Sequence, residues 1–181
     1  MLTVPRTAIA PALLLCPWAE EDIPAMVAAH RDPLIRQWLR KPVATEAEAR
    51  EIIQARRADR QSGTAFSFAV LQVDPAGDTP TLAGSVTVRG LGGESVSGEV
   101  GYWVVASARG RGIAGRALNA VCEWTFRLPR NTPLERLELI HAVGNQASCR
   151  VADKAGFGLS AILPPLPPRF PDDGHLHIRA G

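Results

Sequence analysis

The sequence is short of cysteine, of long apolar runs and of net charge. Its 181 residues hold three cysteines, Cys16, Cys122 and Cys149, with no C-x-x-C pair among them. An odd number of widely spaced cysteines excludes a disulfide framework and a zinc-ribbon pattern, and it predicts reduced thiols in a cytoplasmic protein. The 20 basic and 18 acidic residues nearly cancel, so the composition gives no reason to expect nucleic acid or a membrane surface as a partner.

No stretch of the chain approaches the roughly 18 consecutive apolar residues of a membrane span. The segment 9–16 looks like the apolar core of a short secretory signal, but Pro11 interrupts it and Leu15 occupies the position where cleavage needs a small residue. Apolar residues make up 46% of the chain and charged residues 21%, which suffices for a core. The length fits the roughly 100–200 residues of one domain, so we expect a single domain over 1–181.

Helical and alternating periodicities divide the chain into a mixed α/β pattern. Helices are predicted at 20–30, from the capping box Thr45-Glu46-Ala47-Glu48 to about residue 60, at 113–126 and at 147–155. Strands are predicted at 13–16, 65–73, 81–89, 99–105, 134–143, 157–163 and 175–179. Short joints such as 74–78 favour antiparallel strands, whereas the strand–helix–strand unit from 99 to 143 favours a parallel pair. We expect one mixed, mostly antiparallel sheet of six to seven strands flanked by about four helices.

The segment 99–115, EVGYWVVASARGRGIAG, combines a strand, a glycine-rich turn and the start of a helix. Glycines let the backbone approach a phosphate, and the first N–H groups of a helix, with its dipole, attract negative charge. Arg109 and Arg111 add two full charges. The pattern predicts an anion-binding turn, with a merely solvated turn as the plain alternative.

The same turn also fits the G-x-G-x-x-G string of dinucleotide-binding folds. However, residues 106–109 separate the string from the strand, and the next predicted strand ends without the carboxylate that would hold a ribose. Nicotinamide binding is therefore disfavoured.

Read as R-x-x-G-x-A, Arg109, Gly112 and Ala114 resemble the pyrophosphate-binding motif of the GNAT superfamily of N-acetyltransferases, and 99–104 resembles the E-x-G-Y-W-V strand before it. Residues 145–157 resemble the N-x-x-S-x-x-V-x-x-K-x-G-F signature of the RimJ/RimL-like ribosomal-protein acetyltransferases. The resemblance implies the GNAT fold, with the sheet splayed between its fourth and fifth strands. It also implies acetyl-CoA as co-substrate and an amine as acceptor, either a protein N-terminus or a small molecule.

The resemblance further implies which residues bind acetyl-CoA. Backbone N–H groups of the turn would hold the pyrophosphate, at Arg109, Gly110, Arg111, Gly112, Ile113 and Ala114. A backbone N–H near Val104 would polarise the thioester carbonyl. Asn145 either binds the pantetheine arm or caps the last helix, and Ser148 belongs to the same segment.

Three residues are candidates for catalysis. A base must deprotonate the acceptor amine, and Glu99 resembles the usual base of the family, with His141 as its competitor; a surface carboxylate and a half-buried histidine are the plain alternatives. Many members protonate the leaving thiolate with a tyrosine at the position of Ala152, and Ser148 is the hydroxyl that the RimL-like branch offers instead, unless it only caps the helix. Cys149 points elsewhere on the helix, so no acetyl-cysteine is expected.

Several other features have structural explanations. His175 and His177 lie on one side of a strand, as paired metal ligands do, but no third ligand is expected nearby, so we predict no metal site. The arginine-rich run 50–60 is predicted to be a solvated helix face, and the four tryptophans to be core or cleft wall. The Pro-rich loop 164–171 is expected to shape the acceptor side.

Two further functions stay open. One is a catalytically silent CoA-binding sensor on the same fold, which the missing tyrosine permits, and the other is an unrelated nucleotide-binding regulator. Sheet edges in this fold often pair, so a homodimer is a further expectation.

Overall fold

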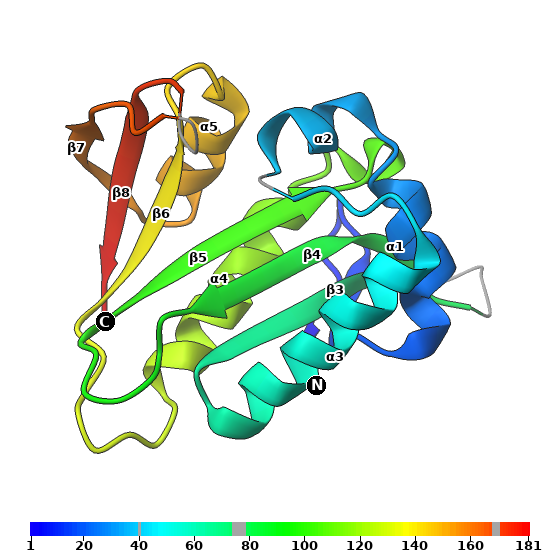
Figure 1. Ribbon diagram of the computed structural model, residues 1–181, viewed down its shortest axis with the longest axis horizontal. Helices are drawn as coiled ribbons and strands as arrows, with labels where there is room; N and C mark the ends of the chain where they lie inside the picture. The colour runs from blue at the N-terminus through cyan, green and yellow to red at the C-terminus, as the bar shows by residue number, and fades with distance from the viewer. Residues whose placement is uncertain (40, 74–78, 168–170) are drawn as a thin grey trace.

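The computed structural model describes residues 1–39, 41–73, 79–167 and 171–181. Within these ranges, eight strands form one sheet in the order β1-β2-β3-β4-β5-β6-β8-β7 (Figure 1). The strands are β1 (Leu2–Val4), β2 (Ala12–Pro17), β3 (Ala65–Val73), β4 (Thr81–Arg89), β5 (Ser97–Val104), β6 (Arg136–Ala142), β7 (Gly158–Leu163) and β8 (Gly174–Ala180). The helices are α1 (Ile23–Ala29), α2 (Pro33–Trp38), α3 (Glu46–Ser62), α4 (Ile113–Phe126) and α5 (Gln146–Lys154), with 3-10 turns at Glu20–Asp22 and Ala106–Ala108.

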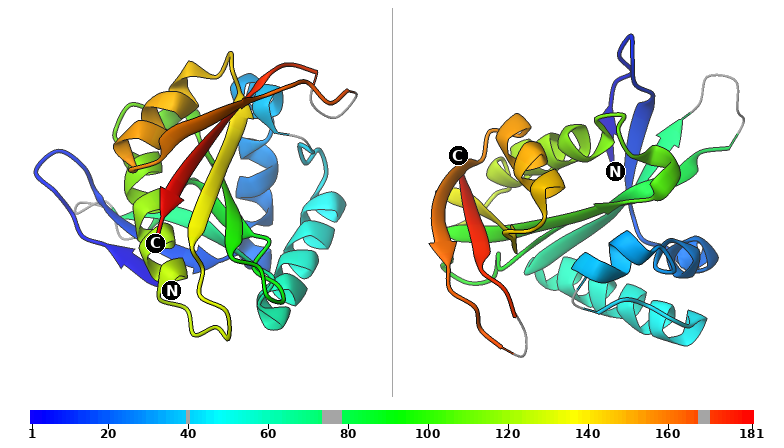
Figure 2. Two further views of the ribbon diagram at one scale, coloured as in Figure 1. Left: turned by 90° about the vertical axis from the view of Figure 1, so that its left-hand side faces the viewer. Right: turned by 90° about the horizontal axis from the view of Figure 1, so that it is seen from above.

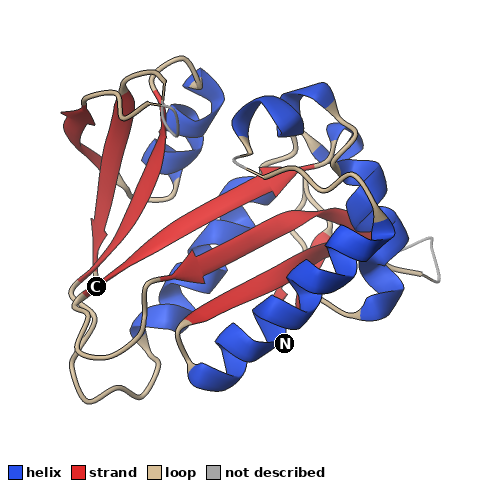
Figure 3. Ribbon diagram, in the orientation of Figure 1, coloured by secondary structure: helices blue, strands red, loops and turns tan. Residues whose placement is uncertain are grey.

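Neighbouring strands pair antiparallel except β5 and β6, which are parallel. The predicted mixed, mostly antiparallel sheet with its parallel pair at this place is confirmed, and the bounds of β3, β4 and α4 match the predicted ranges. The sequence does not predict β1 or α2, and these raise the described total to eight strands and five α-helices (Figure 3). Both elements are too short for a hydrophobic period to show.

Helices cover both faces of the sheet. The edge-on view of Figure 2 shows α1, α2 and α3 on one face and α4 and α5 on the other. Each face has its own buried cluster: Val100 and Leu137 pack with residues of α4 and α5, and Ala69 and Trp103 pack with residues of α1 and α3. Because successive residues of a strand point to opposite faces, odd-numbered positions of β5 face α1 and α3, and even-numbered positions face α4 and α5.

The arginine-rich run of α3 is only partly the solvated face that the sequence predicts. The guanidinium of Arg56 lies 5.3 Å from the ring centre of Trp18, and that of Arg60 lies 5.0 Å from the ring centre of Phe68. Burial lowers the pKa of Arg56 to about 10. These two arginines pack over aromatic rings, so cation–π contacts attach α3 to β3 and to the residue that follows β2.

The sheet opens between β5 and β6. β5 pairs with β4 as far as Val104, but its pairing with β6 ends at Val100, opposite Leu139. Beyond that point β6 continues alongside β8 to Ala142, and the two strands diverge in Figure 1. The splay expected between the fourth and fifth strands lies here, since β1 adds one strand before them.

Within the described ranges, no helix has the length and apolar character needed to cross a membrane. β1 and β7 form the two edges of the sheet. The turn predicted at 74–78 and residues 168–170 of the Pro-rich loop lie outside the described residues.

Candidate active site

The glycine-rich turn lies between β5 and α4, next to the opening of the sheet. Gly110 and Gly112 have φ angles of +74° and +69°, a left-handed conformation that strains other residues, and a Cβ built on either glycine would meet no other described atom within 4 Å. The N–H groups of the first three residues of α4 precede its first hydrogen bond, from Arg116 N to Gly112 O at 3.2 Å. An open, left-handed turn at the start of a 14-residue helix fits a diphosphate.

The two arginines of this turn are not both free charges, contrary to the sequence expectation. Arg109 donates from Nη2 to Asp32 Oδ2 at 2.8 Å and from Nε to the Val104 carbonyl at 3.2 Å. Burial acts to raise the pKa of Asp32, but the N–H groups of Ile35 and Leu34, together with Arg109, lower it below its usual value. Arg109 is therefore an ion-pair partner that ties the end of β5 to α2.

Arg111 is exposed and donates from Nη1 to the neutral Gln72 Oε1 at 3.0 Å. Its charge has no acidic partner among the hydrogen bonds and ion pairs of the described residues. Of the two arginines, Arg111 is thus the one whose charge is available to an anion in the turn.

The backbone of β5 directs hydrogen-bonding groups into the opening. Val105 N donates to Ala83 O at 3.0 Å, so the odd-numbered residues of this strand bond to β4 and the even-numbered ones point their N–H and C=O groups to the opposite side. β6 occupies that side only up to Val100. The N–H groups of Tyr102 and Val104 therefore face the opening, and Val104 is the residue near which the family resemblance implies such a donor.

Tyr102 faces α5, and its hydroxyl donates to Ser148 Oγ at 3.1 Å. Burial raises the pKa of Tyr102, the bond to Ser148 acts in the opposite direction, and the charge of a Cys149 thiolate would add to the rise. The tyrosine is therefore protonated at neutral pH. The sequence analysis does not identify Tyr102 as a site residue. The strand motif at 99–104 contains it, and the alternation of β5 puts it on the opposite face of the sheet from Glu99.

Asn145 is the N-cap of α5, since its Oδ1 accepts from Ser148 N at 3.2 Å. The capping role left open by the sequence is thus observed. One helical turn after Ser148, Ala152 is fully buried in the core beneath α5.

Glu99 is paired with Arg89 on the neighbouring strand. Arg89 Nε donates to Glu99 Oε2 at 3.2 Å, and Arg89 Nη2 bonds to Glu99 Oε1. As an odd-numbered residue of β5, Glu99 faces α1 and α3, whereas Tyr102 and Ser148 lie on the opposite face. The structure therefore does not bring Glu99 together with Ser148.

His141 lies near the end of β6, and its Nδ1 is 2.9 Å from the carbonyl of Ala142. Burial lowers the pKa of His141, the bond to Ala142 acts to raise it, and His177 and His175 add to the lowering. The expectation that no third ligand would lie near His175 and His177 is wrong, because His141 and Cys149 both join them. The sequence could not show this, since three separate elements supply the four side chains.

A cleft of about 550 Å³ lies between α2 and the ends of β6 and β8. Its lining combines an exposed tryptophan, backbone, prolines and two carboxylates: Trp38, Ala142, Val143, Gly144, Pro165, Pro171, Asp172 and Asp173. Trp38 is thus cleft wall, as predicted for the tryptophans. An aromatic ring beside two carboxylates is suited to a positively charged group.

Comparison with known proteins agrees with this geometry. Residues 12–158 match the family profile described as an acetyltransferase (GNAT) domain. YdaF of Bacillus subtilis (strain 168), whose own assignment as a ribosomal N-acetyltransferase is provisional, is 29% identical over 77 residues, which are 42% of this chain and 40% of that protein. This match spans less than half of the curated relative.

Two solved structures show the same fold over nearly their whole length. RimL, a ribosomal-protein alpha-N-acetyltransferase in complex with coenzyme A, has a TM-score of 0.81 at 23% identity, covering 98% of this chain and 97% of its own. The microcin self-immunity acetyltransferase MccE, in complex with acetyl-CoA and AMP, has a TM-score of 0.80 at 17% identity, covering 97% and 98%. Since the family profile covers well over half of the chain, this protein belongs to the GNAT family of acetyltransferase domains.

Proposed function

We propose that residues 1–181 form one N-acetyltransferase domain that moves an acetyl group from acetyl-CoA to a primary amine. The observation that carries the proposal is the opening between β5 and β6, which has the glycine turn at its side, the Val104 N–H directed into it and the Tyr102–Ser148 hydroxyl pair nearby. An anion-binding turn, a backbone donor and a proton donor meet three demands of acyl transfer from a thioester. Membership of the GNAT family supports the proposal.

The chain's own residues divide these tasks. Acetyl-CoA, when bound, supplies an acetyl group activated as a thioester and a thiolate as leaving group. The N–H groups of 110–114 and the charge of Arg111 would hold the pyrophosphate. The Val104 N–H would donate to the thioester carbonyl as negative charge develops there.

A proton for the leaving thiolate would come from the hydroxyl pair. Tyr102 keeps its proton at neutral pH because burial raises its pKa, and Ser148 accepts its hydrogen bond. Ser148 would give its own proton to the thiolate and take one from Tyr102. The silent-sensor alternative rested on the missing tyrosine of the last helix, and Tyr102 supplies a hydroxyl from β5 instead.

For the base we retain Glu99, acting through water from the face of the sheet that carries α2 and Trp38. Its carboxylate is bound by Arg89, so it suits an amine that loses its proton readily. A peptide α-amine with a pKa near 8 loses its proton far more readily than a lysine near 10.4. Peptide N-termini are therefore the acceptor class that this site favours, and the carboxylates of Asp172 and Asp173 would attract the amine into the cleft.

Calorimetric titration of the purified protein with acetyl-CoA, with ATP and NAD as controls, tests the cofactor assignment. We expect saturable binding of acetyl-CoA alone. Binding of ATP in preference to acetyl-CoA would support the nucleotide-binding regulator instead.

Turnover is then measured as release of free CoA thiol. The acceptors are a short peptide with a free α-amine, the same peptide with a blocked N-terminus and an internal lysine, and a polyamine. We expect the first to react fastest. If acetyl-CoA binds and no amine is acetylated, the protein is the silent sensor.

We further propose that the protein is cytoplasmic and has neither nucleic acid nor membrane as a partner; its near-neutral charge and its free cysteines support this. A homodimer would form through the edge strand β7, where Leu159 and Ile162 are exposed. Light scattering on the eluting protein, with Ile162→Lys as the variant, tests the dimer.

A further inference from the structure

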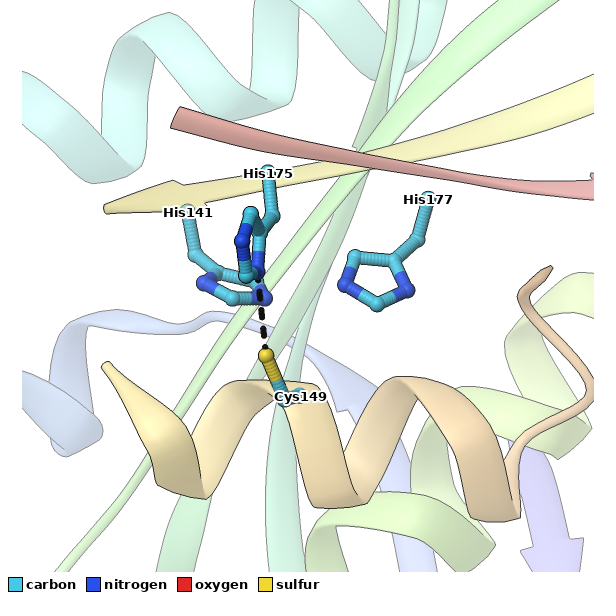
Figure 4. A group of neighbouring side chains, drawn as sticks. All are labelled: His141, Cys149, His175 and His177. Carbon is cyan, nitrogen blue, oxygen red and sulfur yellow. Dashed lines mark hydrogen bonds between the residues drawn. The ribbon is translucent and has the colours of Figure 1, made fainter. Parts of the chain in front are cut away.

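Four potential metal ligands from three elements gather beneath α5. His141 comes from β6, His175 and His177 come from β8, and Cys149 comes from α5 (Figure 4). Their ligand atoms all lie within 4.8 Å of one another. None of the four belongs to the glycine turn, whereas Cys149 directly follows Ser148 of the Tyr102–Ser148 pair.

The sheet register places the three histidines on one face. β6 and β8 pair antiparallel, with His141 opposite His175 and Leu139 opposite His177. Positions 139, 141, 175 and 177 therefore point to the same face, the one that α5 covers. Figure 4 shows Cys149 pointing from α5 towards these rings, with its Sγ 3.2 Å from His175 Nδ1.

The spacing is close to that of a tetrahedral site. The ring centres of His141 lie 5.4 Å from His175 and 5.1 Å from His177. Zinc bonds of about 2.0–2.1 Å to nitrogen and 2.3 Å to sulfur imply distances of roughly 3.3–3.7 Å between neighbouring ligand atoms. Contraction by about 1 Å, within reach of side-chain rotation, would close the set around one ion.

Two of the ring nitrogens are buried without a hydrogen-bond partner among the described residues, namely His141 Nε2 and His177 Nε2. In both rings the other nitrogen is near a backbone carbonyl: His141 Nδ1 is 2.9 Å from Ala142 O, and His177 Nδ1 is 3.4 Å from Phe157 O. A carbonyl accepts only from N–H, so these contacts place the proton on Nδ1 and the lone pair on Nε2. A histidine held through one nitrogen with a lone pair on the other is the arrangement found in metal ligands.

His177 is only 2% exposed, so its unpaired nitrogen is deeply buried. A buried polar atom without a partner destabilises the folded protein, because it has lost its hydrogen bonds to water without gaining others. Coordination of an ion would remove this penalty at both histidines.

We propose that His141, Cys149, His175 and His177 form a binding site for one divalent transition-metal ion, zinc in first place. Three imidazole nitrogens and one thiolate form a borderline-soft, four-ligand set of the kind that zinc prefers. Binding forms one metal–sulfur bond and three metal–nitrogen bonds, and the thiol proton of Cys149 passes to solvent. Four protein ligands leave no open position, so the ion stabilises structure and does not activate water.

The position of the site links metal binding to the neighbouring chemistry. Cys149 follows Ser148 in the first turns of α5, so the ion would fix this helix against β6 and β8 and with it the Tyr102–Ser148 bond. It would also engage His141 Nε2 and leave that residue unable to act as a base. The metal site itself does not depend on the proposed acetyltransferase activity.

The test is titration of the metal-stripped full chain with Co²⁺, which reports a tetrahedral site by visible absorption and a cobalt–thiolate bond by a near-ultraviolet charge-transfer band. We expect both signals to saturate at one equivalent and to disappear when Zn²⁺ is added. Zinc should also raise the Tm of the protein, because the ion binds the folded state.

Cys149→Ser and His175→Gln remove one ligand each from positions that are not fully buried. We expect both to weaken Co²⁺ binding by at least about 10- to 100-fold and the first to abolish the charge-transfer band. Cys16→Ser removes a thiol of similar exposure on β2 and should change nothing. Absence of saturable binding by the wild-type chain, or a Co²⁺ affinity and a zinc-induced rise in Tm that persist in both ligand variants, would overturn the proposal.

Discussion

The hydroxyl of Tyr102 donates to Ser148 Oγ although 46 residues separate the two in the chain. The bond connects β5, where β6 has diverged from it, with the first turn of α5. It thus brings a protonated phenol to a serine that belongs to the family-like segment 145–157. The central strand thus places a tyrosine beside the last helix, which carries none.

We predict that Tyr102→Phe and Ser148→Ala each lower kcat by about 100-fold with little change in the KM for acetyl-CoA, since a lost proton donor typically costs 10²–10⁴-fold in rate. Because the two hydroxyls act in series, the double variant should be no slower than the slower single variant. Steady-state kinetics of the four proteins measure both effects. Ser62→Ala, which removes an exposed hydroxyl at the end of α3, is the control. Additive losses would show that the two hydroxyls act independently.

The glycine turn gives a second prediction. Gly110→Ala with Gly112→Ala should weaken acetyl-CoA binding by at least about tenfold, because alanine costs roughly 1–2 kcal/mol in the left-handed region and the turn would change shape to avoid it. Gly63→Ala is a matched control, since Gly63 also has a positive φ of +71° and open space around a built Cβ, but lies at the end of α3. It should lose stability without losing acetyl-CoA affinity, as calorimetry would show. Equal acetyl-CoA affinity in the turn variant and the wild type would exclude the turn as the pyrophosphate site.

The elements that the sequence predicts well have strong local signals. Thr45 and Glu48 form the predicted capping box at the start of α3, and α4 begins directly after Gly112 as its glycines suggest. The site is less predictable because its contacts join distant segments. The sequence alone predicts Arg109 to be a free phosphate ligand. Its ion-pair partner Asp32 lies 77 residues away, and no local periodicity indicates that contact.

The histidine cluster, too, can be predicted only in part from the sequence. His175 and His177 are visible as a pair because a strand has a period of two. That His141 lies opposite His175 depends on the register of β6 with β8, and the position of Cys149 depends on how α5 packs on the sheet. Neither follows from local sequence, so the sequence shows only the pair His175 and His177 and predicts no metal site, whereas the structure brings four candidate ligands together.

Glu99 gives a third prediction, which separates a base from a purely structural partner of Arg89. Glu99→Gln should lower kcat by about 10- to 100-fold near neutral pH with a peptide α-amine as acceptor. The ratio of wild-type to variant rate should shrink as the pH rises above about 8, because the amine then loses its proton without help. Arg89→Gln controls for the loss of the ion pair. A rate ratio that does not change with pH would assign Glu99 a positioning role.

The last prediction concerns stability in acid and rests on His30. Burial, followed by the nearby charge of Arg56, lowers the pKa of His30 from 6.5 to about 4. The ring is buried, its Nδ1 accepts from Val43 N at 2.8 Å, and it packs edge-on against Trp103. Protonation of Nδ1 would break the bond to Val43 and place a second charge beside Arg56.

Proton linkage gives the direction in which the free energy of unfolding changes with pH. In the unfolded chain His30 binds a proton below about pH 6.5, whereas in the folded protein it stays neutral down to about pH 4. Because the unfolded state binds more protons between these two pH values, the free energy of unfolding falls as the pH drops from 6.5 to about 4. Above pH 6.5 His30 has no such effect. The loss should reach roughly 2–3 kcal/mol by pH 4.5. Urea unfolding at pH 7.5 and 4.5 measures it, and His30→Asn is the matched variant, because its Oδ1 accepts from Val43 N and does not titrate. The variant should lose less stability between the two pH values by that amount, and identical losses in both proteins would show that His30 does not control the acid sensitivity.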